Sequence, residues 1–141
     1  MMPDPGFGPC IKMLNDFMDR EANHHLKAQN LTRSQCHLLM ILHHQREHTA
    51  SLKKLESEFQ VSQPTIVGLV SRLEGKGLIT SFTDPGDRRI KLVQLTDAGR
   101  ETCLQAFRDI QMTEQQLTTV LSPEEKEQLL SLLHRVCTSL R

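Results

Sequence analysis

The sequence predicts a mainly α-helical protein that carries one small β-hairpin, an α+β arrangement with far more helix than strand. Three observations favour this class. Apolar residues recur every three or four positions through most of the chain, two short β-rich stretches flank a Pro-Gly turn, and several expected helices begin at a capping sequence. Hydrophobic residues make up 38% of the 141 residues and charged residues 24%, which suits a packed core and argues against wholesale disorder.

Two helices are expected at the start of the chain. Between residues 11 and 28 the apolar positions are spaced three and four apart, which is typical of an amphipathic helix. Thr32, with Gln35 three residues later, forms a capping-box start for a second helix. The stretch 36–42 that follows is apolar nearly all round, apart from one histidine. We therefore expect the second helix to be central and buried.

A pair of helices joined by a tight turn is predicted next. Residues 52–59 place three apolar side chains on one face of a short third helix. After a turn at residues 60–61, Ser62 is the expected N-cap of a fourth helix, whose first turn tolerates Pro64. The inward stripe and the glycines that end this helix are Ile66, Leu69, Val70, Leu73, Gly75 and Gly77. This order is that of a helix-turn-helix, in which the second helix presents its outward face to the major groove.

A β-hairpin is predicted immediately after this helix pair. The β-rich stretches 78–82 and 89–95 flank the turn at residues 84–87. Pro at the second position and Gly at the third favour a type II turn. The chain has no net charge, but residues 53–91 hold seven Lys and Arg against five Asp and Glu. Any contact with nucleic acid must therefore be local.

Two interpretations of the hairpin tip stay open from the residues alone. The string DPGDRR fits a solvated charged turn, and it also fits a wing whose Arg88 and Arg89 reach phosphates or a narrow minor groove. Asp87 would repel DNA unless its carboxylate held an arginine in one geometry through paired hydrogen bonds. The position of the string after a helix-turn-helix favours the wing.

Two helices that suit association are predicted at the C-terminal end. Thr96 is the expected cap of a long helix, and Ser122 with Glu125 forms a capping box for the last one. The long helix carries a narrow apolar stripe, typical of a helix-helix seam, at Cys103, Phe107, Ile110, Leu117 and Leu121. The last helix has more apolar residues than one side of a small core needs. Because two such faces can cover one another, we expect a homodimer.

Taken together, these motifs resemble the MarR family of bacterial winged-helix regulators. The matching pieces are LT..Q at 31–35, VSQPT at 61–65, LVSRLEGKGLI at 69–79 and DPGDRR......LT..G at 84–99. The resemblance covers roughly residues 11–140.

The resemblance implies a winged helix-turn-helix DNA-binding domain at 31–96 and a helical dimerisation region formed by 1–30 and 97–141. It also implies a homodimer that binds a palindromic double-stranded DNA operator, usually to repress nearby genes. A ligand or an oxidant then releases the dimer from the operator. The resemblance and the outward face of the fourth helix together give the expected DNA-binding residues. These are Ser62, Gln63, Pro64, Thr65, Gly68, Ser71, Arg72, Asp87, Arg88 and Arg89. One departure is Ser81, where family members often carry Arg, so a phosphate contact there is in doubt.

The sequence leaves three kinds of release signal open. The family's default is a small aromatic or anionic effector between the two lobes. Redox sensing by Cys10 is less favoured. Hydroperoxide-sensing relatives use tyrosines to activate a cysteine near the first helix, but this chain has no Tyr, and Gly8-Pro9 suggests a loose end. Zinc sensing is also less favoured. His44 and His48 could share a helix face as ligands do. However, zinc-sensing relatives use histidines on the long helix after the wing, and residues 97–121 contain none. We expect no metal site and no cofactor.

Several other classes are disfavoured. The chain shows no phosphate-binding glycine loop, no GxSxG and no HExxH, so we do not expect an enzyme. It has no run of roughly 18 apolar residues and no secretory leader, and its four cysteines form no CxxC, so we expect a cytoplasmic protein that contacts no membrane. The remaining alternative is a winged-helix module that binds another protein instead of DNA.

Overall fold

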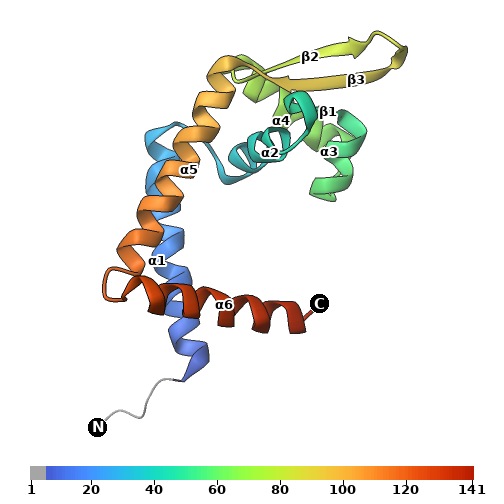
Figure 1. The fold of residues 1–141 in the computed structure, drawn as a ribbon. Helices are drawn as coiled ribbons and strands as arrows, with labels where there is room; N and C mark the ends of the chain where they lie inside the picture. The colour runs from blue at the N-terminus through green and yellow to red at the C-terminus, as the bar shows by residue number, and fades with distance from the viewer. Residues whose placement is uncertain (1–5) are drawn as a thin grey trace.

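The computed structural model describes residues 6–141, and in this part of the chain six α-helices, one short 3-10 helix and three strands form the fold (Figure 1). Along the chain they are α1 Phe7–Ala28, α2 Arg33–His43, the 3-10 helix Arg46–His48, β1 Thr49–Ser51, α3 Leu52–Phe59, α4 Gln63–Gly75, β2 Ile79–Asp84, β3 Asp87–Leu95, α5 Asp97–Leu117 and α6 Pro123–Ser139. The strands form one antiparallel sheet in the order β1-β3-β2. The mainly helical class with a small hairpin is therefore confirmed. The first five residues of the predicted helical region 1–30 lie outside the described part.

The core lies where α2, α3 and α4 pack against the sheet (Figure 1). Burying an aliphatic side chain of this size contributes about 1.5–3 kcal/mol relative to leaving it exposed. The largest fully buried side chains are Leu38, Leu39, Leu42, Leu55, Ile66, Leu73, Val93 and Cys103. Three of them come from α2, which confirms that this helix is central.

Local side-chain chemistry fixes where three of the helices begin. The Thr32 hydroxyl accepts from the Gln35 backbone N–H at 3.1 Å, and the Gln35 side chain accepts from the Thr32 N–H at 3.2 Å. Ser122 and Glu125 repeat this reciprocal pair at the start of α6. Thr96 caps α5 through the Gly99 N–H at 3.0 Å. Each such cap is worth about 1 kcal/mol, and all three were predicted from the sequence.

The first helix begins earlier than predicted. α1 starts at Phe7 rather than at residue 11, so the expectation of a loose end at Gly8-Pro9 is wrong. Proline is compatible with the first turn because the N–H groups there have no partner within the helix. Pro9 therefore removes no hydrogen bond that α1 would otherwise make.

The hairpin turn also differs from its prediction. A type II turn needs a positive φ at its third residue, and Gly86 does not have one. Instead the Asp84 side chain accepts a hydrogen bond from the Gly86 N–H at 2.9 Å, so the aspartate closes the turn. The pairing register shifts between Thr83 and Asp84. A two-residue reversal nevertheless joins β2 and β3, as a hairpin requires.

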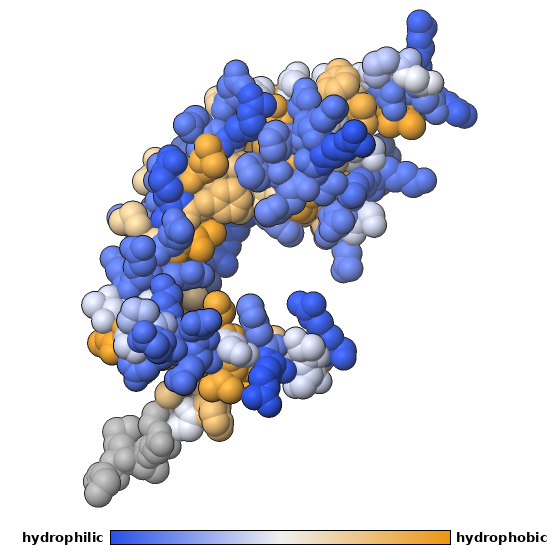
Figure 2. Space-filling view, in the orientation of Figure 1, coloured by the Kyte–Doolittle hydropathy of each residue, from blue (hydrophilic) through white to orange (hydrophobic). Residues whose placement is uncertain are grey.

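The arms of the molecule are built differently from its core. α1 and α5 run side by side away from the sheet, and α6 crosses their far end (Figure 1). Neither α1 nor α6 has a single buried residue. Figure 2 shows apolar surface over these arms. The exposed apolar side chains of α6 are Leu129, Leu130, Leu132, Leu133, Val136 and Leu140.

The two parts meet where α5 begins. A Cβ at Gly99 would overlap the backbone carbonyl of Leu78, so only glycine allows α5 to start this close to the preceding chain. The Thr96 side chain donates to the Gly77 carbonyl at 2.7 Å at the same junction. None of the described helices has the length and hydropathy that a membrane span would need.

Candidate nucleic-acid interface

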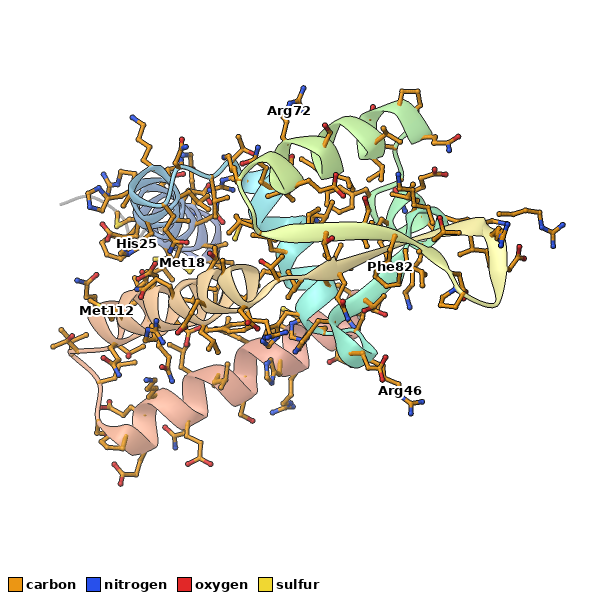
Figure 3. All side chains as sticks on the ribbon, turned by 90° about the horizontal axis from the view of Figure 1, so that it is seen from above. Met18, His25, Arg46, Arg72, Phe82 and Met112 are labelled. Carbon is orange, nitrogen blue, oxygen red and sulfur yellow. The ribbon has the colours of Figure 1, made fainter. Side chains whose placement is uncertain are left out.

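One face of α4 is exposed along the whole helix. Its buried stripe of four aliphatic residues, as predicted, packs into the core, and this turns the opposite side outward. Of the predicted residues on α4, all are exposed except Gly68, which is half-buried: Ser62, Gln63, Pro64, Thr65, Ser71 and Arg72. In Figure 3 Arg72 points away from the sheet. Gln and Arg side chains at such positions can make paired hydrogen bonds to base edges.

The N-terminus of α4 remains available to an anion. Ser62 stands at the N-cap position, but its hydroxyl lies 3.0 Å from the Thr65 hydroxyl and makes no cap hydrogen bond to the backbone. The first turn contains no acidic residue. The first N–H groups of a helix lack partners within it, and together with the helix dipole they favour a negative charge. This end of α4 therefore suits a phosphate.

Gly68 has no internal reason to lack a side chain. A Cβ built there would meet only the flexible Arg72 side chain, at 4.0 Å. Close packing against another part of residues 6–141, which is one possible reason for a glycine here, is therefore excluded. Glycine in a helix interior costs about 1 kcal/mol relative to alanine. The remaining explanation is the close approach of something outside the chain.

At the hairpin tip, Arg89 is hydrogen-bonded to Asp87. Both Asp87 carboxylate oxygens accept from the Arg89 guanidinium at 3.1 Å, and the carboxylate also accepts from the Arg89 backbone N–H at 3.0 Å. These hydrogen bonds from Arg89 hold the pKa of Asp87 below its ordinary value. The Arg89 side chain is nevertheless 90% exposed, and Arg88 beside it is exposed too. The predicted aspartate–arginine pair is present, and its carboxylate orients the guanidinium.

The hairpin tip and the α4 face form two separate contact regions. Within residues 6–141 no hydrogen bond or ion pair joins Arg88 or Arg89 to α4. Ser81 lies further back on β2, and its hydroxyl donates to Glu74 of α4. A side chain at that position is directed at the protein.

Sequence reasoning missed one residue of α4 and one residue directly after it. Val67 is 45% exposed on the outward face, four residues after Gln63 and four before Ser71, so helical periodicity could have placed it there. Lys76 follows α4 and donates to the Asn30 carbonyl and to the Gln35 side chain, the latter at 2.8 Å. No sequence pattern signals this tie, because its partners lie more than forty residues away.

The histidines do not form the arrangement considered from the sequence. α2 ends at His43, so His44 and His48 do not share a helix face and that interpretation is wrong. The His43 ring instead contacts the tilted ring of His48 and, edge-on, the ring of Phe107, with ring centroids 5.0 Å from each. In the described residues no group of three or more histidine, cysteine or acidic side chains is placed to hold a metal ion.

The cysteines fall into two environments. Cys103 is buried, and burial together with nearby Cys36 raises its pKa to about 11. Burial also raises the pKa of Cys36. Because the thiolate is the reactive form, a raised pKa makes both thiols less reactive. Cys137 is exposed on α6, and Cys10 is exposed in α1.

A cavity of about 530 Å³ opens between α1, α2 and α5. Its lining is mixed, and nine of the sixteen lining residues are polar or charged. Met18 and His25, labelled in Figure 3, belong to the wall that α1 contributes. A concave site that combines apolar surface with placed polar groups is the usual form of a small-molecule site.

Known proteins share both the sequence pattern and the fold. The sequence profile of the MarR family matches residues 31–91. A MepR variant from S. aureus superimposes with a TM-score of 0.85 at 27% identity, covering 96% of this chain and 98% of that one. The chain is therefore similar to the MarR family, in sequence over residues 31–91 and in fold over nearly its whole length. Members of this family are transcriptional regulators, in agreement with the expectation that the chain is not an enzyme.

Other MarR-family relatives extend the match. Wild-type MarR from E. coli in its apo form has a TM-score of 0.75 at 28% identity, over 96% of this chain and 97% of that one. S. aureus MepR in a complex with DNA has a TM-score of 0.79 at 27% identity, over 96% and 100%. An uncharacterized HTH-type transcriptional regulator of Bacillus subtilis, YdgJ, is 28% identical over 106 residues. That alignment spans 75% of this chain but only 63% of the relative's length.

Proposed function

We propose that this MarR-family protein binds a palindromic DNA operator as a homodimer and represses the adjacent genes. In this proposal, a small molecule that binds the protein releases it from the DNA. The observation that carries the proposal is that one chain has both an exposed α4 face, on which Gly68 leaves room for a close approach, and a wing arginine that Asp87 holds in place. The fold shared with MepR, which has been solved with DNA, supports the same function. The site of action would be the cytoplasm.

In this proposal α4 reads bases and the wing contacts the backbone or minor groove. Gln63, Thr65 and Arg72 would reach base edges, while Gly68 lets the helix approach closely. Arg88 and Arg89 would reach the neighbouring groove from the hairpin tip. The remaining proposed contacts are Ser62, Pro64 and Ser71, which lie on the same α4 face.

The homodimer is supported by the uncovered arms. The apolar side chains of α1 and α6 lie in solvent in the single chain, and large exposed apolar patches mark interaction sites. Two copies related by a two-fold axis would cover these faces mutually. The same axis would place two α4 helices about 34 Å apart, one turn of DNA. Binding should then be steeply salt-dependent, because each copy supplies half of the phosphate contacts.

The alternative function, a protein-binding winged helix, explains less. A protein-binding module has no need for an exposed Arg72 together with two exposed arginines on the wing. Nor does it explain a helix-interior glycine that internal packing does not require. DNA, with its regular phosphate backbone, accounts for all of these features.

The direct test replaces Arg89 with Ala. We expect operator affinity to fall at least tenfold with no lowering of the melting temperature, since the side chain is exposed and packs against no core residue. Mobility-shift titration gives the affinity and thermal denaturation gives the stability. Arg135→Ala, an exposed arginine of α6, is the matched control and should bind as the unaltered protein does. Equal affinity of the two variants would show that the wing is assigned wrongly.

A further inference from the structure

Val67 places an apolar side chain in the middle of the polar outward face of α4. Its side chain is 45% exposed. Gln63 lies four residues before it and Ser71 four residues after it, so the three share one side of the helix. Within residues 6–141, Val67 belongs neither to the buried core nor to the partly buried apolar side chains that pack against that core. Much of its surface therefore meets water in the single chain.

Helix stability does not explain a valine at this position. Valine loses side-chain freedom in a helix and glycine is a still poorer helix former, yet Val67 and Gly68 stand side by side inside α4. Packing within the described residues requires neither of them, because Val67 is exposed and a Cβ at Gly68 would meet only the Arg72 side chain. A single exposed valine is ordinary on a protein surface. Two successive residues that oppose their own helix are typical of a functional position.

The pair suits contact with a base edge if α4 lies in the major groove, so this inference rests on the proposed function. Valine is a short side chain, and it reaches a base only where the helix backbone comes close. Gly68, directly beside it, leaves the space for that approach. Four residues of helix, about 6 Å, separate Val67 from Gln63 and from Ser71, more than the roughly 3.4 Å between stacked base pairs. Val67 would therefore meet a base pair of its own.

The chemistry of the major groove limits which base pair this can be. Its edges carry hydrogen-bond donors and acceptors, and the one apolar group among them is the C5-methyl group of thymine. Valine forms no hydrogen bond, so against an amino or carbonyl group it would displace water and leave that group without a partner. Against a methyl group it removes apolar surface from water on both sides of the contact.

We propose that Val67 selects thymine at one position of each operator half-site through contact with the C5-methyl group of that base. Two copies related by a two-fold axis make the contact twice, at symmetric positions. The group that is read is the methyl group itself, and thymine is the unmodified DNA base that carries it.

Removal of the methyl group from the DNA tests the proposal. An operator is first selected from random duplexes, and each thymine of the half-site is then replaced by uracil, which lacks only the C5-methyl group. Mobility-shift titration of the full chain should find one position where uracil lowers affinity about fourfold in one half-site and about fifteenfold in both. A half-site without thymine overturns the proposal, as does one in which no uracil lowers the affinity.

The Val67→Ala variant assigns the contact to this residue. Uracil at the sensitive position should weaken its binding by less than about twofold, because the partner of the methyl group has been removed. Its melting temperature should not fall, since Val67 is exposed and alanine is the better helix former. Val120→Ala, at an 89% exposed valine in the turn between α5 and α6, is the matched control and should keep the whole uracil effect.

A uracil effect of full size in Val67→Ala overturns the assignment. Thr65, whose hydroxyl lies 3.0 Å from that of Ser62, also carries a methyl group on this part of α4. Loss of the uracil effect in Thr65→Ser, with its full size kept in Val67→Ala, would give the contact to Thr65 instead.

A second DNA substitution adds the methyl group rather than removing it. Cytosine and 5-methylcytosine, each paired with guanine, are placed at the sensitive position. The methylated base should bind about fourfold more tightly for each half-site, because the two differ only in the C5-methyl group. Equal affinity for the two cytosines contradicts a contact with the methyl group.

These titrations separate the inference from the proposed function. If an operator is bound selectively and the uracil effect depends on Val67, both stand. If an operator is bound selectively and no methyl group matters, only the role of Val67 fails. If selection yields no operator and no duplex is shifted, the proposed function fails and the role of Val67 fails with it.

Discussion

The winged-helix unit and the helical arms of this protein differ in how they bury their apolar side chains. In the unit, α2, α3, α4 and the sheet contribute seven large side chains that are almost completely buried within one chain. In the arms, α1 and α6 bury none, although each carries an apolar face. A unit that buries its own apolar side chains can keep its structure without a partner, whereas an arm with an uncovered apolar face needs another protein surface to cover it. The difference is the one that the proposed homodimer requires, in which the unit binds DNA and the arms join two copies.

The largest effect is expected from a charge on the uncovered face of α6. Leu133→Asp should weaken dimerisation more than a thousandfold, because it would place an unpaired carboxylate in a dry seam. Sedimentation velocity should show a monomer, and the winged-helix unit should still unfold cooperatively. Ser131→Asp, on the opposite side of α6, should remain dimeric. A Leu133→Asp dimer would mean that the arms need no partner.

The junction of the two regions gives the next largest effect. Gly99→Ala forces a Cβ against the Leu78 carbonyl, and such overpacking costs about 1–3 kcal/mol. Chemical denaturation measures the loss. A variant as stable as the unaltered protein would show that α5 can shift away from the unit without penalty.

A matched glycine on the outer face of the unit should behave in the opposite way. Gly68→Ala should gain about 1 kcal/mol of stability, because the added methyl group meets open space and alanine favours the helix. It should also weaken operator binding several-fold, since the methyl group would hold α4 away from DNA. Denaturation and mobility shift measure the two effects. A gain in stability with unchanged affinity would remove the close-approach explanation.

The smallest effect concerns His43, which lies where α2 meets Phe107 of α5. Burial, followed by nearby His48 and His44, lowers the pKa of His43 below 6.5. The unfolded chain therefore takes up this proton first, so His43 lowers the stability as the pH falls below about 6.5 and has no effect above it. His43→Gln should flatten the pH dependence of the melting temperature between pH 7.5 and 5.5. His24→Gln, at an exposed site, should leave the slope unchanged.

The features predictable from the sequence are those that local chemistry determines. Thr32, Thr96 and Ser122 begin helices because their caps need only residues three positions away. The pairing of Asp87 with Arg89 is equally local. Strand β1 was missed because three residues carry no periodicity, and its pairing with β3 is made more than forty positions along the chain.

The cavity between α1, α2 and α5 lay beyond sequence reasoning for the same reason. Asp109, one of its lining residues, reads as an ordinary polar position of an amphipathic helix, and only the packing of α1 against α5 buries it. A glycine inside a helix is unusual, but only the space around Gly68 shows that packing within the described residues does not require it. Contacts that arise from tertiary packing leave no local pattern to find.

Hydroxyl-radical footprinting on a selected operator tests the account most directly. Two copies held together by their arms should protect two stretches about one helical turn apart, roughly 34 Å, with flanking minor-groove protections that disappear in Arg89→Ala. A single protected stretch, or none at moderate ionic strength, would contradict a paired winged-helix protein that reads DNA.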